Sequence, residues 1–191
     1  FGYEMPFMVH LPIILGLDRS KLSKRHGATS ILDYQLEGYL PDAMVNFLAM
    51  LGWSLDDSTD VISRESLIQS FSLDRIIPSP AVFNQEKLDW LNGVYIRQLT
   101  PSALAREILP LLESRLPAEV PRPIDLEYLL KVIPLEQERM KWLAEVENLT
   151  SFFFVDQPAY DPQELIPKGF EPGAVSSILA QCLANLDGAG E

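Results

Sequence analysis

The chain has 191 residues, of which 47% are apolar and 22% are charged. This composition predicts a folded globular protein, because disordered chains carry fewer apolar side chains. The formal net charge at pH 7 is −12, which argues against a broad electrostatic surface for nucleic acid.

The first residues predict a short strand that leads into a turn. Residues 5–17 form an apolar run that Pro6 and Pro12 interrupt, which excludes a regular helix and is typical of an edge strand. A turn beginning at Gly16 then leads into a basic motif at residues 21–27, with the sequence Lys-Leu-Ser-Lys-Arg-His-Gly.

Two helices are expected after this basic motif. Ser30 is a good N-cap with Asp33 three residues later, and Gly38 predicts the end of a short helix. Pro41 predicts the start of a second helix that ends at Gly52. We expect this second helix to supply core residues at helical spacing, namely Met44, Val45, Leu48 and Leu51, with Phe47 and Trp53 beside them.

The middle of the chain predicts three further helices. Ser63 caps a short helix that ends at Phe71, and Asn84 caps a longer helix over residues 85–99. Another helix is expected over residues 100–116. The buried face of the longer helix is expected to carry Leu88, Leu91, Tyr95 and Leu99.

Prolines organise the remainder of the chain. The segment 117–123 holds three prolines and predicts a stiff, extended linker, which marks the main internal boundary. Beyond it we expect helices at residues 125–133 and 135–154, separated by Pro134, and a last amphipathic helix at residues 173–186. The predicted fold class is mainly α, with helical bundle domains and a short strand remnant at the N-terminus.

Few residues could carry metal or nucleophilic chemistry. Two histidines and one cysteine give no cluster with metal-ligand spacing, so we expect no metal site. No Gly-x-Gly-x-x-Gly or Walker loop is present, and Ser23 near His26 lacks an orienting carboxylate. The single Cys182 excludes an internal disulfide and predicts a buried thiol in a reducing compartment. No apolar stretch reaches the length of a membrane span, so no membrane partner is expected.

The basic motif is the strongest chemical feature of the sequence. Lys21 and Lys24, with Ser23 between them, can place two ammonium groups around one phosphate chain, and Gly27 lets the backbone approach. Such a loop suits phosphoryl or nucleotidyl transfer, in which positioned cations stabilise developing negative charge. The site would be local, because the whole acidic excess of the chain lies after residue 40.

The basic motif also resembles a known signature. Residues 21–25, Lys-Leu-Ser-Lys-Arg, resemble the KMSKS signature of class I aminoacyl-tRNA synthetases in the form typical of bacterial glutamyl-tRNA synthetases. Further blocks resemble the same family in the same order: Glu37-Gly-Tyr-Leu-Pro, Leu51-Gly-Trp, Ser79-Pro-Ala-Val-Phe and Lys87-Leu-Asp-Trp-Leu-Asn-Gly-Val-Tyr-Ile-Arg. The resemblance implies a glutamate–tRNA ligase, which activates glutamate with ATP and transfers it to tRNA.

The resemblance implies roles for individual residues. Lys24 is expected to contact the ATP phosphates and to stabilise the charge that develops during adenylate formation, with Lys21 as the second catalytic cation. A mobile ATP-binding loop is implied for Lys21, Leu22, Ser23, Lys24 and Arg25. Contacts with tRNA are implied for Lys87, Asn92, Tyr95 and Arg97, whereas Leu88, Trp90 and Leu91 are expected in the core.

Partners and domains are implied as well. The expected ligands are ATP with Mg²⁺, tRNA(Glu), and glutamate through an N-terminal half that this chain lacks, in a cytoplasmic monomer. We expect the end of a catalytic domain at residues 1–28, a helical stem-contact region at 29–116, the linker at 117–123, and part of an α-helical anticodon-binding region at 124–191. The HIGH-type motif of the family is missing, so the chain is expected to be a C-terminal fragment that is inactive alone.

Two alternatives compete with this interpretation. A helical protein-interaction module with an incidental basic loop would also explain the amphipathic helices and the acidic surface. A glutaminyl-tRNA synthetase has a similar signature loop, but its anticodon-binding region is β-barrel in character. Because residues 101–186 show no period-2 alternation, the sequence favours the glutamyl form.

Overall fold

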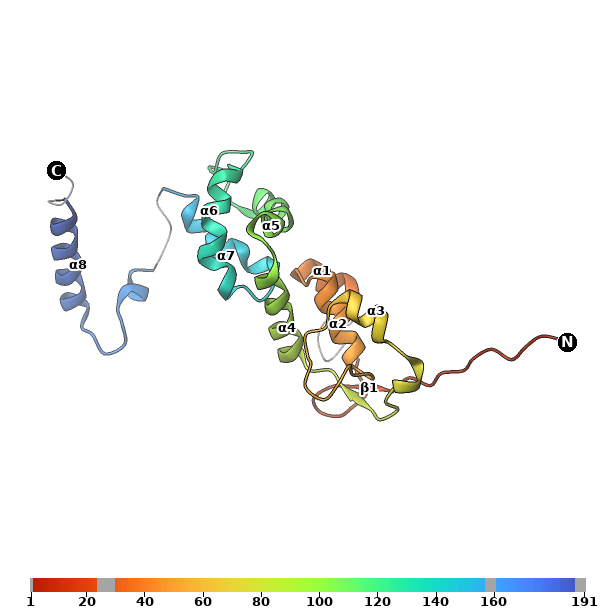
Figure 1. Ribbon diagram of the computed structural model, residues 1–191. Coiled ribbons are helices and arrows are strands. Elements are labelled where there is room, and N and C mark those ends of the chain that lie inside the picture. Colours follow the sequence, from red (N-terminus) through yellow and green to blue (C-terminus); the bar gives the residue numbers. More distant parts are fainter. Residues whose placement is uncertain (1, 24–29, 157–160, 188–191) are drawn as a thin grey trace. The chain divides into compact units, whose positions relative to one another are not determined.

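The computed structural model describes residues 2–23, 30–156 and 161–187. The chain divides into two compact units, residues 1–154 and 155–191. In the described residues the fold is mainly α, as the sequence predicts, and it also contains one small parallel sheet whose second strand is not predicted (Figure 1).

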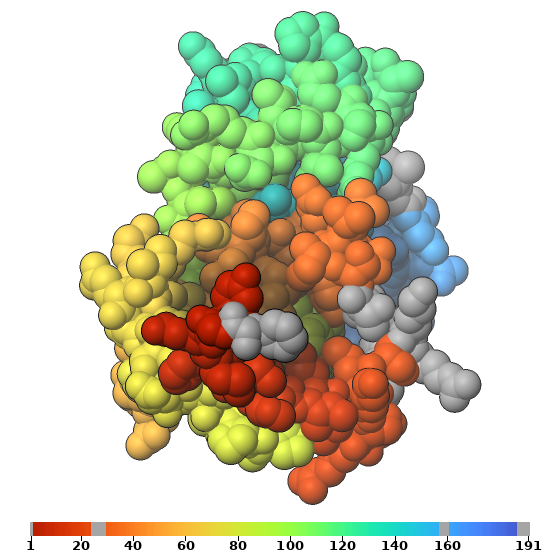
Figure 2. Space-filling model, turned by 90° about the vertical axis from the view of Figure 1, so that its right-hand side faces the viewer, coloured from red at the N-terminus to blue at the C-terminus, as the bar shows by residue number. Residues whose placement is uncertain are grey.

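The N-terminal segment forms much less strand than its apolar run predicts. Strand β1 is confined to Ile14–Leu15 and pairs in parallel with β2, Ala81–Val82. Residues 2–13 form no regular element and expose several large apolar side chains. Pro12 interrupts the ladder and instead packs against Gly52, whose missing side chain leaves room for the proline ring. Figure 2 shows this side of the unit, with the residues around β1 in red beside the yellow-green residues around β2.

Helices α1 and α2 follow the expected boundaries. Helix α1, Ile31–Glu37, begins at a capping box formed by Ser30 and Asp33, and helix α2 is Pro41–Met50. Between them Gly38 adopts φ +87°, and a Cβ at this position would lie 2.7 Å from Leu143 Cβ. Glycine is therefore needed here both for the turn and for close packing.

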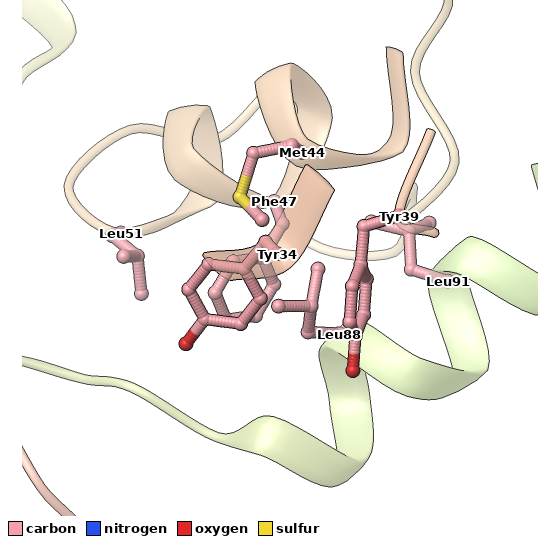
Figure 3. Packing of buried hydrophobic residues seen from close by; sticks show 7 residues of the cluster. All are labelled: Tyr34, Tyr39, Met44, Phe47, Leu51, Leu88 and Leu91. Carbon is pink, nitrogen blue, oxygen red and sulfur yellow. The ribbon is translucent and has the colours of Figure 1, made fainter. Parts of the chain in front are cut away.

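One core cluster of the first unit lies between α2 and α4, Gln85–Gln98. Figure 3 shows seven of its buried side chains gathered between these helices, with the hydroxyls of Tyr34 and Tyr39 at the edge. The predicted core stripe of α2 is partly wrong, because Val45 and Leu48 are exposed while Phe47 is buried. Helix α4 then extends from the α1–α3 group to α5–α7 (Figure 1).

A smaller cluster packs beside this core. It is built around Trp53, with α3, Arg64–Ser70, and the short 3₁₀ turn η2, Leu73–Arg75. The Arg75 guanidinium stacks 5.0 Å from the Trp53 ring centroid and donates hydrogen bonds to the carbonyls of Ser54 and Leu55.

The proline-rich segment 117–123 is not the extended linker that the sequence predicts. It is a loop inside the first compact unit, between α5, Pro101–Arg115, and α6, Leu126–Glu136. Val120 is 4% exposed, and the Arg122 guanidinium donates to the carbonyls of Leu116 and Val120. Buried apolar contacts and these hydrogen bonds fold the segment back, so its prolines stiffen a packed loop. The functional domain limits inferred from the resemblance stay predictions.

Pro134 does not separate two helices as predicted. It lies inside α6 on the exposed side, where the carbonyl left without an amide partner can be solvated. The expected second helix is a series of short elements: η3, Gln137–Arg139; η4, Leu143–Glu145; α7, Val146–Thr150; and η5, Ser151–Phe153.

The second unit contains η6, Pro162–Leu165, and α8, Pro172–Asp187. Cys182 on α8 is exposed, which corrects the expectation of a buried thiol. Its apolar neighbours Ile178, Leu179 and Leu183 are also about half exposed or more, so amphipathic periodicity does not produce burial here. Among the described residues, no helix is both long and apolar enough to cross a membrane.

Candidate functional site

The basic motif begins on a short hairpin that we call the basic hairpin, residues 14–23. The Leu22 amide donates to the Ile14 carbonyl at 3.0 Å, and the Gly16 amide donates to the Ser20 carbonyl at 2.9 Å. Leu15 and Lys21 form an antiparallel bridge between the two arms. Because β1 also pairs with β2, the hairpin fixes where the motif leaves the body of the protein.

The tip of the basic hairpin is held by local hydrogen bonds. The Asp18 carboxylate accepts from the Ser20 amide at 3.0 Å and from the Ser20 hydroxyl at 2.9 Å. Arg19 takes a left-handed backbone conformation, with φ 61°. This tight turn brings Lys21 to an exposed position on the returning arm.

The described part of the predicted ATP-binding loop consists of Lys21, Leu22 and Ser23. The side chains of Lys21 and Ser23 are exposed and that of Leu22 is half-buried. Lys24 and Arg25, and with them the expected mobility of the loop, lie outside the described residues. The role assigned to Lys24 therefore stays a prediction.

A capped helix begins after the motif. The Ser30 hydroxyl accepts from the Leu32 amide at 3.2 Å, while the Asp33 carboxylate accepts from the Ser30 amide at 3.3 Å. The segment that carries Lys24 thus runs from a hydrogen-bonded hairpin to a capped helix. Both attachment points belong to the first compact unit.

The structure separates the residues predicted to contact tRNA. The Lys87 ammonium lies at the surface, 2.7 Å from the Asp60 carboxylate. The Tyr95 hydroxyl points inward, 2.8 Å from the Ile62 carbonyl and 3.0 Å from the Asn46 amide oxygen, and burial raises its pKa. Tyr95 therefore supports the core more than it presents a polar group to solvent.

Asn92 is a correction to the predicted set. It is fully buried, its amide oxygen accepts from the Leu40 amide at 2.8 Å, and its amide nitrogen donates to the Lys141 carbonyl at 2.6 Å. These bonds satisfy two backbone groups outside the helices, the Leu40 amide and the Lys141 carbonyl, and they tie both segments to α4. Asn92 is thus a structural link, and its burial leaves no surface for a tRNA contact.

A hollow of about 370 Å³ lies beside α4. Trp90, predicted in the core, is 46% exposed at this hollow because its side of α4 faces away from the packed helices. Arg97 from the same helix and Lys141 from the turn before η4 also line it, with Glu86, Asp89 and Gly93. We call this set the α4 hollow. No feature of the sequence connected Lys141 with the helix, since 43 residues lie between Arg97 and Lys141.

A polar network closes the core beside the α4 hollow. The Tyr39 hydroxyl donates to the Asp89 carboxylate, and the Gln85 side-chain amide donates to both of these groups. Burial, with the charge of Glu37, raises the pKa of Tyr34 to about 12. Burial and the bond to Asp89 raise the pKa of Tyr39 as well. The Asp89 carboxylate therefore already accepts hydrogen bonds on the side that faces the core.

Two family models match this chain. The catalytic domain of class I tRNA synthetases (E and Q) matches residues 1–90, and an anticodon binding domain matches residues 103–190. A glutamate–tRNA ligase from Dehalococcoides mccartyi (strain CBDB1) is 48% identical over 97% of the chain. The chain belongs to the glutamate–tRNA ligase family.

Other members of the family agree with this assignment. A glutamate–tRNA ligase from Herpetosiphon aurantiacus is 44% identical over 98% of the chain. A crystal structure of a glutamate tRNA ligase from Elizabethkingia meningosepticum, in complex with its amino acid, matches 96% of the chain with a TM-score of 0.75 and 30% identity. The chain spans 38% of the length of the two curated relatives and 39% of the solved chain.

Family membership decides between the alternatives. An incidental basic loop on an interaction module would not explain similarity along almost the whole chain. The described part of residues 101–186 is helical and contains no strand, in agreement with the expected glutamyl form. Within the described ranges, no group of three potential ligands could hold a metal ion.

Proposed function

We propose that this chain supplies the ATP-phosphate loop and part of the tRNA-binding surface of a glutamate–tRNA ligase. The main support is the position of the family's signature motif, which runs from the basic hairpin to the cap of α1. The chain that carries it is 48% identical to such a ligase. The proposed reaction is activation of glutamate by ATP, followed by transfer of the glutamyl group to tRNA(Glu).

In this proposal Lys24 binds ATP phosphate oxygens and stabilises the negative charge that grows on them as adenylate forms. An ammonium group suits this task because it is a compact point charge with three donors. Lys21, at the end of the basic hairpin, adds a second cation at a defined position. Mg²⁺ bound with the nucleotide would neutralise further phosphate charge.

The tRNA partner is proposed to lie along the surface of the helices after the motif. Lys87 and Arg97 are candidate contacts, and the region after residue 103 matches an anticodon binding domain. Glutamate would be bound by residues outside this chain, in a monomeric cytoplasmic enzyme. The large acidic excess of the chain makes these tRNA contacts local.

ATP–pyrophosphate exchange tests the role of Lys24. In the enzyme that carries this chain, Lys24→Ala should lower the rate of glutamate-dependent exchange about 100-fold or more, because a positioned charge at the reacting phosphates is lost. The KM for glutamate should change little. Lys168→Ala is the matched control, since Lys168 is an exposed lysine of the second unit. Equal exchange in both variants would refute the assignment.

The chain alone should show no glutamate-dependent exchange, because the HIGH-type motif is missing from it. Normal exchange by the isolated chain would contradict this expectation. Binding of tRNA(Glu) to the chain should be weak and should weaken further as salt is raised, since phosphate contacts release counterions. Fluorescence anisotropy of labelled tRNA at several salt concentrations measures both properties.

A further inference from the structure

Most cationic side chains in the described part of the chain are committed to other protein groups. Seven donate to carbonyls or pair with carboxylates: Arg64, Arg75, Lys87, Arg106, Arg115, Arg122 and Arg139. The side chains of Arg97 and Lys141 form no hydrogen bond or ion pair within the described ranges. Two uncommitted cations that line one hollow are unusual in a chain with net charge −12.

The α4 hollow is shaped by side chains on one face of α4. Trp90, Gly93 and Arg97 recur at spacings of three and four, so they lie on the same side of the helix. A Cβ at Gly93 would lie 3.0 Å from a guanidinium nitrogen of Arg97 and 3.3 Å from the Met140 carbonyl oxygen. The absence of a side chain at Gly93 therefore leaves room for the Arg97 guanidinium against the helix and makes the hollow deeper there.

Lys141 is held beside α4 from both sides of its backbone. Its carbonyl accepts from the buried Asn92 amide at 2.6 Å, and its amide donates to the Glu145 carboxylate at 2.6 Å. The Lys141 side chain remains exposed. This segment is thus fixed before any ligand binds, which lowers the entropy cost of binding.

We propose that the α4 hollow binds the ribose–phosphate backbone of tRNA, with Arg97 and Lys141 on phosphate oxygens and Trp90 against a ribose. The proposal rests on the function proposed above and locates part of its tRNA surface. A half-exposed tryptophan gives a flat apolar face and an indole N–H, and this N–H forms no hydrogen bond within the described part of the chain. Ribose 2′-hydroxyls and phosphates are the groups that an RNA helix displays to a protein surface.

The carboxylates of the hollow set its polarity. Asp89 also lines the hollow, and one of its carboxylate oxygens accepts from Tyr39 and Gln85. Glu86 is exposed at the edge of the hollow and would repel a phosphate. Glu86→Gln should therefore strengthen tRNA binding, because it removes this repulsion.

Anisotropy of labelled tRNA(Glu) with the full chain tests this proposal. Arg97→Gln and Lys141→Gln should each weaken binding about three- to tenfold and reduce the salt slope by about 1. Trp90→Ala should weaken binding about tenfold, while Trp90→Phe keeps most of the affinity, because the flat apolar face remains. Circular dichroism should show that each variant keeps its helical content.

Matched controls separate this site from the general function. Phe7→Ala removes another exposed aromatic side chain and Arg19→Gln removes another exposed cation, both before the helices proposed to face tRNA; each should leave affinity within twofold. Binding by the wild type that is insensitive to Trp90, Arg97 and Lys141 would overturn the α4 hollow alone. Absence of wild-type binding would overturn both this site and the proposed tRNA surface, while leaving the Lys24 exchange test intact.

Discussion

The basic hairpin and the α4 hollow both present cations, but the protein holds them in different ways. The turn of the hairpin depends on backbone bonds and on the exposed Asp18–Ser20 contacts between residues close in sequence, and the pairing of β1 with β2 adds a contact with a distant segment. The hollow depends on the buried Asn92, which joins α4 to residues 40 and 141. Local bonds can rearrange without unfolding the protein, whereas a buried link cannot. Substitutions at the two places should therefore separate loop function from global stability.

Asn92→Ala should give the largest effect. It leaves the Leu40 amide and the Lys141 carbonyl without their partner, and we expect a loss of about 2–4 kcal/mol in the free energy of unfolding. Urea unfolding measures this loss. Gln98→Ala, an exposed site on α4, should change stability by about 0.5 kcal/mol or less. Similar values for both variants would contradict the role of Asn92.

The second-largest effect is expected from alkaline pH, which should lower the free energy of unfolding through the core beside α4. The pKa of Tyr34 is raised to about 12 in the folded state, so the folded protein keeps a proton that the unfolded chain releases above pH 10. This contribution is complete below pH 10 and is lost as pH rises toward 12, on the order of 2 kcal/mol. Urea unfolding from pH 9 to 12 measures it. Tyr34→Phe should flatten the profile, and Tyr3→Phe in the exposed N-terminal segment should not.

Asp18→Ala should act on the basic hairpin alone. It removes the exposed hydrogen bonds from Ser20, with an expected cost of about 0.5–1 kcal/mol in the hairpin. Amide exchange at Leu22, which donates across the hairpin, should become about two- to fivefold faster. The urea midpoint of the whole chain should stay the same. A shifted midpoint would show that the hairpin is coupled to the core.

Lys87→Gln should have the smallest effect. The pair with Asp60 is exposed on both sides, so its loss should cost about 0.5 kcal/mol or less. Because Lys87 is already paired, tRNA affinity should fall less than in Arg97→Gln. Anisotropy under identical salt compares the two variants, and an equal or larger fall for Lys87→Gln would place the tRNA nearer Asp60 than the α4 hollow.

Local signals in the sequence located most helix boundaries. Ser30, Ser63, Asn84 and Thr100 each cap the helix that was expected after them, because a cap needs only its own side chain and the next three residues. Proline was less informative. Pro134 lies within α6, since an exposed helix face tolerates one unpaired carbonyl when the other side is packed.

The candidate site was only partly predictable, because some of its features are contiguous in sequence and others depend on which distant groups meet in the fold. The motif at residues 21–25 is contiguous, so its chemistry could be recognised directly from residue types and spacing. Asn92 and Trp90 lie two positions apart on α4. The sequence predicts a buried Trp90 and a surface Asn92, whereas Trp90 is half-exposed and Asn92 is buried. An amide can be buried when two backbone groups satisfy it, and an indole can be exposed when its helix face has no neighbour.

The sequence by itself determined the helical character of the chain, the caps, the basic motif and its resemblance to glutamyl-tRNA synthetases. All of these depend on residues within a few positions of one another. The tertiary structure decided that segment 117–123 is a packed loop and that Lys141 joins Trp90 and Arg97 beside α4. Those outcomes depend on which distant groups meet, because burial and hydrogen-bond satisfaction are properties of the folded neighbourhood and not of the local chain.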